Sequence, residues 1–205
     1  YEKVRLRGEG GFGVVWEVRA RAEPGRRFAL KVIEVDDVAT ANAGVLEATR
    51  LAECRHPNLL AAREQFFHNR WGEAHWLARL CVAPWELCIV MELCAEGSLW
   101  ELLDRLWDAD ESLPERVILQ VGAQLAGALA CIHARGLVHR DVKPENVFIA
   151  RRDADGALAI KLGDLGQALQ LDAPRRAPKS FRGAALKHAP PPGLRPIASA
   201  TGLSG

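Results

Sequence analysis

The sequence predicts an α+β fold with two lobes, a β-rich N-terminal lobe that carries one long helix and a partial helical C-terminal lobe. Segments with the composition of strands dominate residues 1–93, whereas the strongest helical periodicity comes later, at 114–134. Strands first and helices afterwards favour a sheet-rich unit joined to a helical one. The 205 residues, 49% hydrophobic and 26% charged, also have the composition of a globular protein long enough for two lobes.

The N-terminal half shows the alternation and turn chemistry of strands around one helical segment. A helix is predicted at 40–54, where Val45, Leu46 and Leu51 share a helical register, and His56-Pro57-Asn58 ends it. An insertion is expected at 68–84, because this segment is longer than a tight hairpin needs. The predicted strands are Val4–Leu6, Val14–Arg19, Phe28–Val35, 59–67 and 86–93.

The C-terminal half begins with helices and ends in a segment of different composition. Leu99–Trp107 suits a short helix, and 114–134 suits a long one because apolar residues recur on one face behind Pro114. Two strands, 147–150 and 158–162, flank a turn at 153–156. After Ala173 come six of the eleven prolines and six Arg or Lys, with no Asp or Glu. This tail is expected to be disordered.

Composition narrows the class of protein and its compartment. The net charge of +1 gives no indication of nucleic acid as a partner. No apolar run approaches 18 residues, so no membrane span is expected. The five cysteines form no C-x-x-C pair and are odd in number, which favours reduced thiols in a cytoplasmic or nuclear protein. The chain starts at Tyr1 without a methionine, so we expect a piece of a longer gene product.

The segment 139–146, His-Arg-Asp-Val-Lys-Pro-Glu-Asn, carries the most specific chemistry. Asp141, Lys143 and Asn146 place an acid, a cation and an amide on one loop, and Asp164 follows eighteen residues after Asn146. Transfer of a phosphoryl group from ATP to a hydroxyl needs such groups, to accept a proton, to neutralise charge and to hold a metal ion. The alternative interpretation is a polar loop between a helix and a hairpin. All eight residues resemble the catalytic loop of the eukaryotic protein kinases, and this resemblance disfavours the alternative.

A glycine-rich segment near the N-terminus fits a phosphate-covering hairpin. Residues 8–15 match G-x-G-x-x-G-x-V, and a dinucleotide-binding turn is the rival interpretation. That rival needs a helix directly after the glycines, whereas Val14-Val15-Trp16-Glu17-Val18 reads as a strand. Glycines let the backbone fold close over phosphates because no Cβ intervenes.

Together these motifs resemble the eukaryotic protein kinases over residues 1 to about 170. A lysine two residues after Asp141, here Lys143, resembles the pattern of the serine/threonine kinases. The segments 139–148 and 161–166 are similar to those of the NimA-related kinases. The resemblance implies three parts: a kinase N-lobe that binds ATP at 1–93, a partial C-lobe with the catalytic loop at 94–171, and the tail at 172–205.

The resemblance also implies residue roles, with ATP and Mg²⁺ as the bound species. Asp141 would orient the substrate hydroxyl and take its proton, assisted by Lys143 and Asn146. Asn146 and Asp164 would hold magnesium. Lys31, paired with Glu47, would hold the α- and β-phosphates. The implied nucleotide-binding residues are Gly8, Glu9, Gly10, Gly11, Phe12, Gly13, Val15, Ala29, Lys31, Glu47, Met91, Glu92, Cys94 and Phe148.

The sequence departs from the family pattern in four places. Arg7 replaces the usual aliphatic residue before the first glycine, so contact with the base would be weaker or come from Leu6. Leu165 replaces the usual phenylalanine, as an apolar residue of similar reach. Residues 183–191 match the family's closing anchor only in part. The helices expected after about residue 170 are not recognisable, which would leave apolar surface exposed on the helix 114–134.

Three functions fit these observations. The first is a protein serine/threonine kinase domain, with ATP and the Ser/Thr hydroxyls of a protein as substrates. The second is an ATP-binding regulatory or scaffold module, impaired in catalysis because the C-lobe is incomplete. The third is a small-molecule kinase of the aminoglycoside type, which shares the Asp and Asn spacing. Lys143-Pro144 and the glycine hairpin disfavour this third function.

Overall fold

The computed structural model describes residues 1–10, 13–23, 25–70 and 85–171. Several predictions fall outside the described residues. These are the roles of Gly11 and Phe12, most of the insertion at 68–84, the partial anchor at 183–191 and the tail at 172–205.

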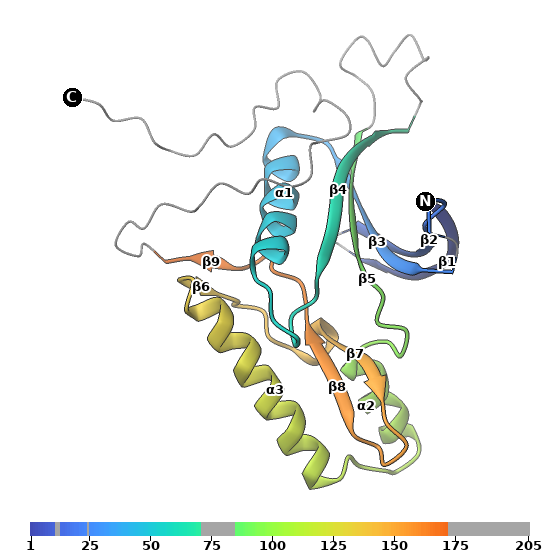
Figure 1. The fold of residues 1–205 in the computed structure, drawn as a ribbon, viewed down its shortest axis with the longest axis vertical. Coiled ribbons are helices and arrows are strands. Elements are labelled where there is room, and N and C mark those ends of the chain that lie inside the picture. Colours follow the sequence, from blue (N-terminus) through green and yellow to red (C-terminus); the bar gives the residue numbers. More distant parts are fainter. Residues whose placement is uncertain (11–12, 24, 71–84, 172–205) are drawn as a thin grey trace, which may run out of the picture.

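A five-stranded antiparallel sheet in the order β1-β2-β3-β5-β4 forms the N-terminal lobe (Figure 1). Its alternating side chains give it two faces. Phe28, Leu30 and Val32 of β3 are buried on one face, and Ala29 and Lys31 point to the other. The strands are β1 (Glu2–Gly10), β2 (Gly13–Arg19), β3 (Arg27–Val35), β4 (Ala62–Asn69) and β5 (Trp85–Glu92).

Strand β4 begins three residues later than predicted and extends beyond 67. Leu59 and Leu60 pair with the C-terminal lobe instead of joining the sheet. Leu59 forms a parallel bridge with Leu162, and the Leu60 amide donates to the Leu162 carbonyl at 2.9 Å. The apolar run at 59–67 therefore divides between two lobes, a division that hydrophobicity alone does not reveal.

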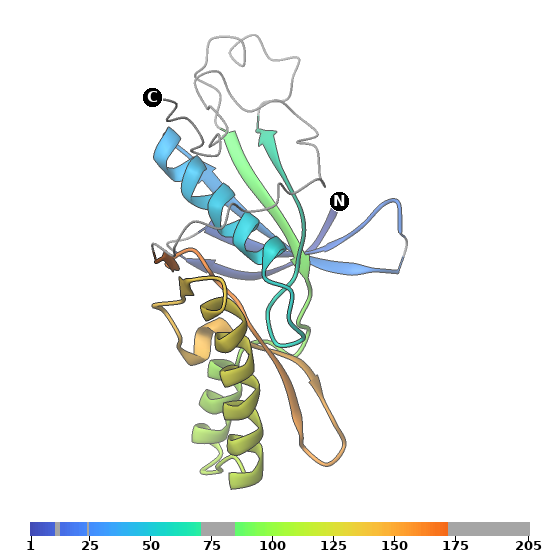
Figure 2. The ribbon, with the colours of Figure 1, turned by 60° about the vertical axis from the view of Figure 1, so that its left-hand side comes forward.

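Helix α1 (Val38–Glu53) covers one face of the sheet, where it contacts β3, β4 and β5 (Figure 2). Asp37 caps its N-terminus, because its carboxylate accepts a hydrogen bond from the Thr40 amide at 2.7 Å. A Cβ added at Gly44 would lie 2.5 Å from Leu87 Cδ2, so the helix and the sheet approach too closely there for any side chain.

The C-terminal lobe contains two helices and a hairpin. Helix α3 (Glu115–His133) packs against β8 (Leu158–Leu162), and α2 (Leu99–Asp108) packs against β7 (Val147–Arg152). A capping box between Ser98 and Glu101 starts α2. The remaining elements are β6 (Leu137–Val138), which pairs with β9 (Leu169–Gln170), and a 3₁₀ turn, η2 (Pro144–Asn146). This arrangement confirms the predicted α+β, two-lobed fold class.

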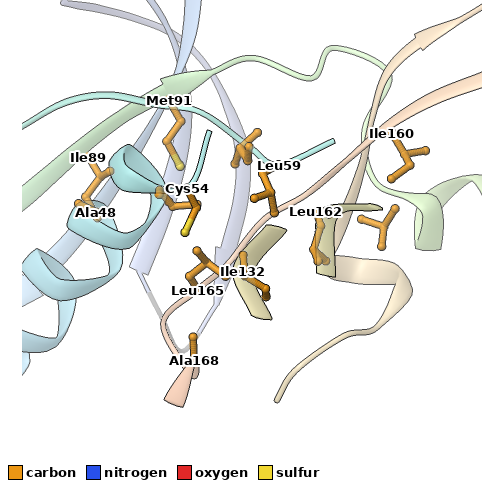
Figure 3. Close-up of a cluster of buried hydrophobic side chains, with 14 of the residues drawn as sticks. Ala48, Cys54, Leu59, Ile89, Met91, Ile132, Ile160, Leu162, Leu165 and Ala168 are labelled. Atoms are coloured by element: carbon orange, nitrogen blue, oxygen red, sulfur yellow. The ribbon is translucent and has the colours of Figure 1, made fainter. Parts of the chain in front are cut away.

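One hydrophobic core joins the two lobes (Figure 3). Ala48 of α1 and Ile89 of β5 belong to the same buried cluster as Ile132 of α3 and Leu162 of β8. Leu165 is fully buried in it, as expected of an apolar residue that replaces phenylalanine. A second cluster, which includes Phe28, Leu30 and Val90, covers the opposite face of the sheet. The two lobes are therefore held together by one shared hydrophobic cluster, to which α1 also contributes.

Helix α3 has one buried face and one exposed face. Val117, Val121 and Ala128 are buried, whereas Ile118 and Leu119 are 55% and 66% exposed. The prediction that this helix exposes apolar surface is thus confirmed. By length and composition alone α3 would also suit a membrane span, a test that core helices of soluble proteins pass as well.

Glu17, in the middle of β2, is a buried carboxylate that binds three arginines. Its side chain is 1% exposed. One oxygen lies 2.9 Å from Arg5 Nε and 3.0 Å from Arg7 Nε, and the other lies 2.5 Å from Arg27 Nη1. The hydrogen bond from Arg27, followed by the hydrogen bond from Arg5 and the positive charge of Arg7, holds the pKa of Glu17 below its ordinary value against the effect of burial.

We predict that Glu17→Gln lowers the free energy of unfolding at pH 7 by about 1 to 2 kcal/mol, because hydrogen bonds to a charged group are lost and two of the arginines are half-exposed. Since the pKa of Glu17 is depressed in the folded state, its contribution is complete above the unfolded value and is lost as the pH falls below about 5. Urea unfolding at pH 7 and pH 4 measures both. A difference between wild type and variant that does not narrow at pH 4 would contradict the assignment.

Candidate active site

A cavity of about 440 Å³ lies between the sheet and the C-terminal lobe. Part of its wall comes from β1 and β2, which carry Gly8, Gly10 and Gly13 and are called the glycine strands below. The wall also includes residues of β3, α1, β7 and the linker between β5 and α2 (93–98). The structure gathers around it every predicted nucleotide- and metal-binding residue that it describes: Gly8, Glu9, Gly10, Gly13, Val15, Ala29, Lys31, Glu47, Met91, Glu92, Cys94, Asn146, Phe148 and Asp164.

Lys31 and Glu47 form an ion pair in the interior of this cavity. Lys31 Nζ lies 2.8 Å and 2.9 Å from the two carboxylate oxygens of Glu47. Their side chains are only 10% and 6% exposed. Burial raises the pKa of Glu47, whereas the Lys31 ammonium opposes that rise. The structure thus brings the predicted pair together, one member from β3 and the other from α1.

The glycines of β1 and β2 differ in whether the protein structure could accept a side chain at their positions. Gly13 has φ of 109°, and a Cβ there would lie 2.2 Å from the Val32 carbonyl oxygen, so the position requires glycine. A Cβ at Gly8 or Gly10 would meet nothing within 4 Å. The protein itself therefore leaves open space beside these two glycines, on the cavity wall.

The linker between β5 and α2 forms the inner end of the cavity. Met91 is 6% exposed. The Glu92 carboxylate accepts hydrogen bonds from the Ala61 amide at 2.7 Å and from Lys161 Nζ at 2.9 Å, which fixes the end of β5. Burial raises the pKa of Cys94 to about 12. The backbone of this linker is positioned by side chains from both lobes.

Asp141, Lys143 and Asn146 form one hydrogen-bonded group at the edge of the cavity. Asp141 Oδ2 lies 2.8 Å from Lys143 Nζ and accepts a hydrogen bond from Asn146 Nδ2 at 2.9 Å. Asn146 also donates to the Asp141 backbone carbonyl at 2.8 Å. Lys143 is the main cause that keeps the pKa of Asp141 below its ordinary value. The carboxylate is therefore ionised at neutral pH and ready to accept a proton.

His139 and Arg140 hold the catalytic loop in place. His139 is 1% exposed; its Nδ1 accepts from the Asp141 amide at 3.3 Å, so the proton lies on Nε2, which donates to the Gly163 carbonyl at 3.0 Å. Arg140 Nε donates to the Gln167 carbonyl at 2.7 Å. Both Arg140 and Asp164 have positive φ, 67° and 58°, a strained state for residues with side chains.

Asn146 and Asp164 are suited to Mg²⁺. Both hydrogen bonds that the Asn146 side chain makes within the described residues use its nitrogen, which leaves the amide oxygen to face a cation. Asp164 contributes a carboxylate on the same cavity. Hard oxygen donors of these two kinds, completed by phosphate oxygens and water, are what Mg²⁺ prefers. Among the described residues there is no cluster of three or more His, Cys, Asp or Glu that would hold a metal ion by itself.

Several cavity residues were not predicted from the sequence. Leu60 and Glu145 lie on the cavity wall, as do Ser98 and Glu101 at the start of α2. Leu6 does not line this cavity: the residue is 47% exposed and lines a separate depression beside Trp16. Arg7 lines the cavity instead. The one feature of the sequence that could have indicated Arg7 as a cavity residue is its position directly before Gly8.

The sheet-and-helix fold, the buried Lys31–Glu47 pair and the catalytic loop define the protein kinase class. The family model described as "Protein kinase domain" matches residues 1–191. The chain therefore belongs to the eukaryotic protein kinase family.

Several curated relatives align with most of the chain. Cyclin-dependent kinase-like 1 of Caenorhabditis elegans is 32% identical over 170 residues, 82% of this chain and 41% of that protein. The probable serine/threonine-protein kinase zyg-1 of Caenorhabditis briggsae is 31% identical over 83% of this chain and 21% of its own length. Mouse serine/threonine-protein kinase Nek4 is 30% identical over 84% and 19%. The chain thus spans less than half of the length of each of these relatives.

The two kinds of glycine provide a test of the cavity. We predict that Gly10→Ala leaves the melting temperature unchanged or slightly higher, because the added Cβ meets no protein atom. The same change weakens ATP binding, by about tenfold, because it occupies space that phosphates need. Gly13→Ala, by contrast, lowers the melting temperature, since its Cβ would collide with Val32. Thermal melts and nucleotide titrations measure both. Equal effects of the two substitutions on stability would refute this account of the glycine strands.

Proposed function

We propose that this chain carries the ATP-binding and catalytic residues of a protein serine/threonine kinase, which transfers the γ-phosphate of ATP to Ser or Thr hydroxyls of a protein substrate. The observation that carries the proposal is the arrangement of two charged groups around one cavity. The Lys31–Glu47 pair lies on the N-lobe side, and the Asp141–Lys143–Asn146 group lies on the C-lobe side. Membership of the kinase family and relatives named as serine/threonine kinases support it.

The cavity wall is suited to an adenine nucleotide. Val15 and Ala29 from the sheet and Phe148 from β7 supply apolar surface for the two faces of the base. The backbone of Glu92 and Cys94 supplies donors and acceptors for its edge. Lys31 would bind the α- and β-phosphates, under the backbone of the glycine strands.

The transfer step uses the acid, the cation and the amide of the catalytic loop. Mg²⁺, held by Asn146 and Asp164, would neutralise charge on the phosphates. Asp141 orients the substrate hydroxyl and accepts its proton as the hydroxyl oxygen bonds to the γ-phosphorus. The bond from that phosphorus to the β–γ bridging oxygen breaks, and ADP leaves. Lys143, 2.8 Å from Asp141, places positive charge beside the moving phosphoryl group.

Finer features of the function are also proposals. Lys143 favours Ser and Thr over Tyr as acceptors, through the family resemblance. The NimA-related subgroup and a cytoplasmic or nuclear location rest on sequence alone, since relatives of several kinase subgroups align at similar identity. The substrate is a proposal as well, because the chain spans less than half of the length of the relatives that it matches.

We predict that Asp141→Asn lowers phosphate transfer from Mg-ATP to a generic basic protein by about 10²-fold or more, because the proton acceptor is lost. The variant should still bind ATP, since Asp141 does not line the cavity. Radiolabel transfer measures the first effect, and the rise in melting temperature with Mg-ATP measures the second.

Asp153→Asn is the matched control, because it removes the same charge from an exposed turn where Asp153 pairs only locally with Arg151. Full activity of the Asp141 variant would overturn the catalytic assignment. Wild-type protein that binds Mg-ATP but transfers no phosphate would instead support an ATP-binding regulatory or scaffold module.

A further inference from the structure

Arg7 contacts Glu17 of the neighbouring strand β2 and Ala95 of the distant linker after β5. It lies on β1 directly before Gly8. Of the three arginines around Glu17 it is the least exposed, at 21% against 60% for Arg5 and 53% for Arg27. It is also the one of the three that lines the cavity.

The guanidinium of Arg7 is held at both ends. Its Nε lies 3.0 Å from Glu17 Oε2 on β2, an ion pair without a hydrogen bond at that nitrogen. Its Nη1 and Nη2 both donate to the backbone carbonyl of Ala95, at 3.3 Å, across 88 residues of sequence. Ala95 belongs to the linker after β5 and directly follows Cys94, a cavity residue. The planar fork of arginine makes such a double contact possible, whereas a lysine offers one ammonium.

Glu17 makes this contact durable. Its carboxylate is buried and bound by Arg5 and Arg27 as well, so it does not move to follow Arg7. Strand β1 is an edge strand that pairs only with β2 in the described sheet. The contact between Arg7 and Ala95 therefore ties the free edge of the glycine strands to the linker.

The position of the contact separates it from the phosphates. In the sheet register Lys31 pairs with Ile89, three residues before β5 ends at Glu92, whereas Ala95 lies three residues beyond that end. Arg7 thus acts at the linker end of the cavity, where the resemblance to kinases places the base. An effect through the linker is independent of the number of phosphates on the nucleotide.

We propose that Arg7 is a positioning residue that latches the glycine strand to the linker and thereby slows the exchange of adenine nucleotides. The proposal rests on the proposed function, because it requires that this cavity binds them. Nucleotide entry and exit then require the two hydrogen bonds to Ala95 to open. The rival explanation is that Arg7 simply attracts the negative charge of the phosphates.

The test is stopped-flow measurement of the dissociation of methylanthraniloyl-labelled ATP and ADP, with Mg²⁺, from wild type, Arg7→Met, Arg7→Lys and Arg5→Met. Arg5→Met is the matched control, because Arg5 lies 2.9 Å from the same Glu17 oxygen but, among the described residues, neither lines the cavity nor bonds to the linker. Melting temperatures of the variants show whether each one folds.

We expect both Arg7 variants to release the two nucleotides about tenfold faster than wild type and by equal factors, a change of 1.4 kcal/mol in barrier height. Arg5→Met should leave the rates unchanged, because Arg27 still holds Glu17 and the bonds from Arg7 to Ala95 remain, although it lowers the melting temperature as Arg7→Met does. Wild-type rates in Arg7→Lys, a larger effect on ATP than on ADP, or equal acceleration in Arg5→Met would each overturn the latch. Wild-type protein that binds neither nucleotide would overturn the proposed function with it.

Discussion

The buried ion pair between Lys31 and Glu47 is the constraint on which the arrangement of this protein depends. Each charge is almost fully withdrawn from water, and removing one partner of such a pair costs roughly 3–5 kcal/mol because the other is left uncompensated. The pair therefore requires α1 to lie on the sheet in one register. Helix α1 in turn contacts the segment after β8, where Arg50 donates to the Leu165 carbonyl at 3.2 Å. The positions of the sheet, the helix and the Asp164 loop are thus coupled through α1, by this ion pair on one side and by the Arg50–Leu165 hydrogen bond on the other.

Much of the fold and of the candidate site could be predicted, because the informative residues are close together in sequence. Asp141, Lys143 and Asn146 lie within six residues, so their spacing alone indicated a single functional loop. Helix α3 showed its apolar face through simple periodicity. The pairing of Lys31 with Glu47 rested on the family resemblance, and the structure places the two side chains in contact.

What the sequence did not reveal depends on contacts between distant residues. Leu59 and Leu60 look like the start of a strand, yet pairing with Leu162 draws them to the other lobe. Arg7 looked like a departure from an aliphatic position, and only the fold shows that it reaches Ala95. The positive φ of Asp164 has the same origin, since surrounding packing and not local preference holds a strained backbone.

Cys94 adds a consequence for chemical probes of this protein. Cys94 belongs to the wall of the cavity, an attractive location for an electrophilic inhibitor. Yet burial raises its pKa to about 12, so very little of the thiol is in the reactive thiolate form at pH 7. An acrylamide or chloroacetamide warhead aimed at Cys94 would therefore react slowly. Selective ligands for this cavity should therefore bind reversibly, by fitting the shape of the cavity and by contacting Arg7.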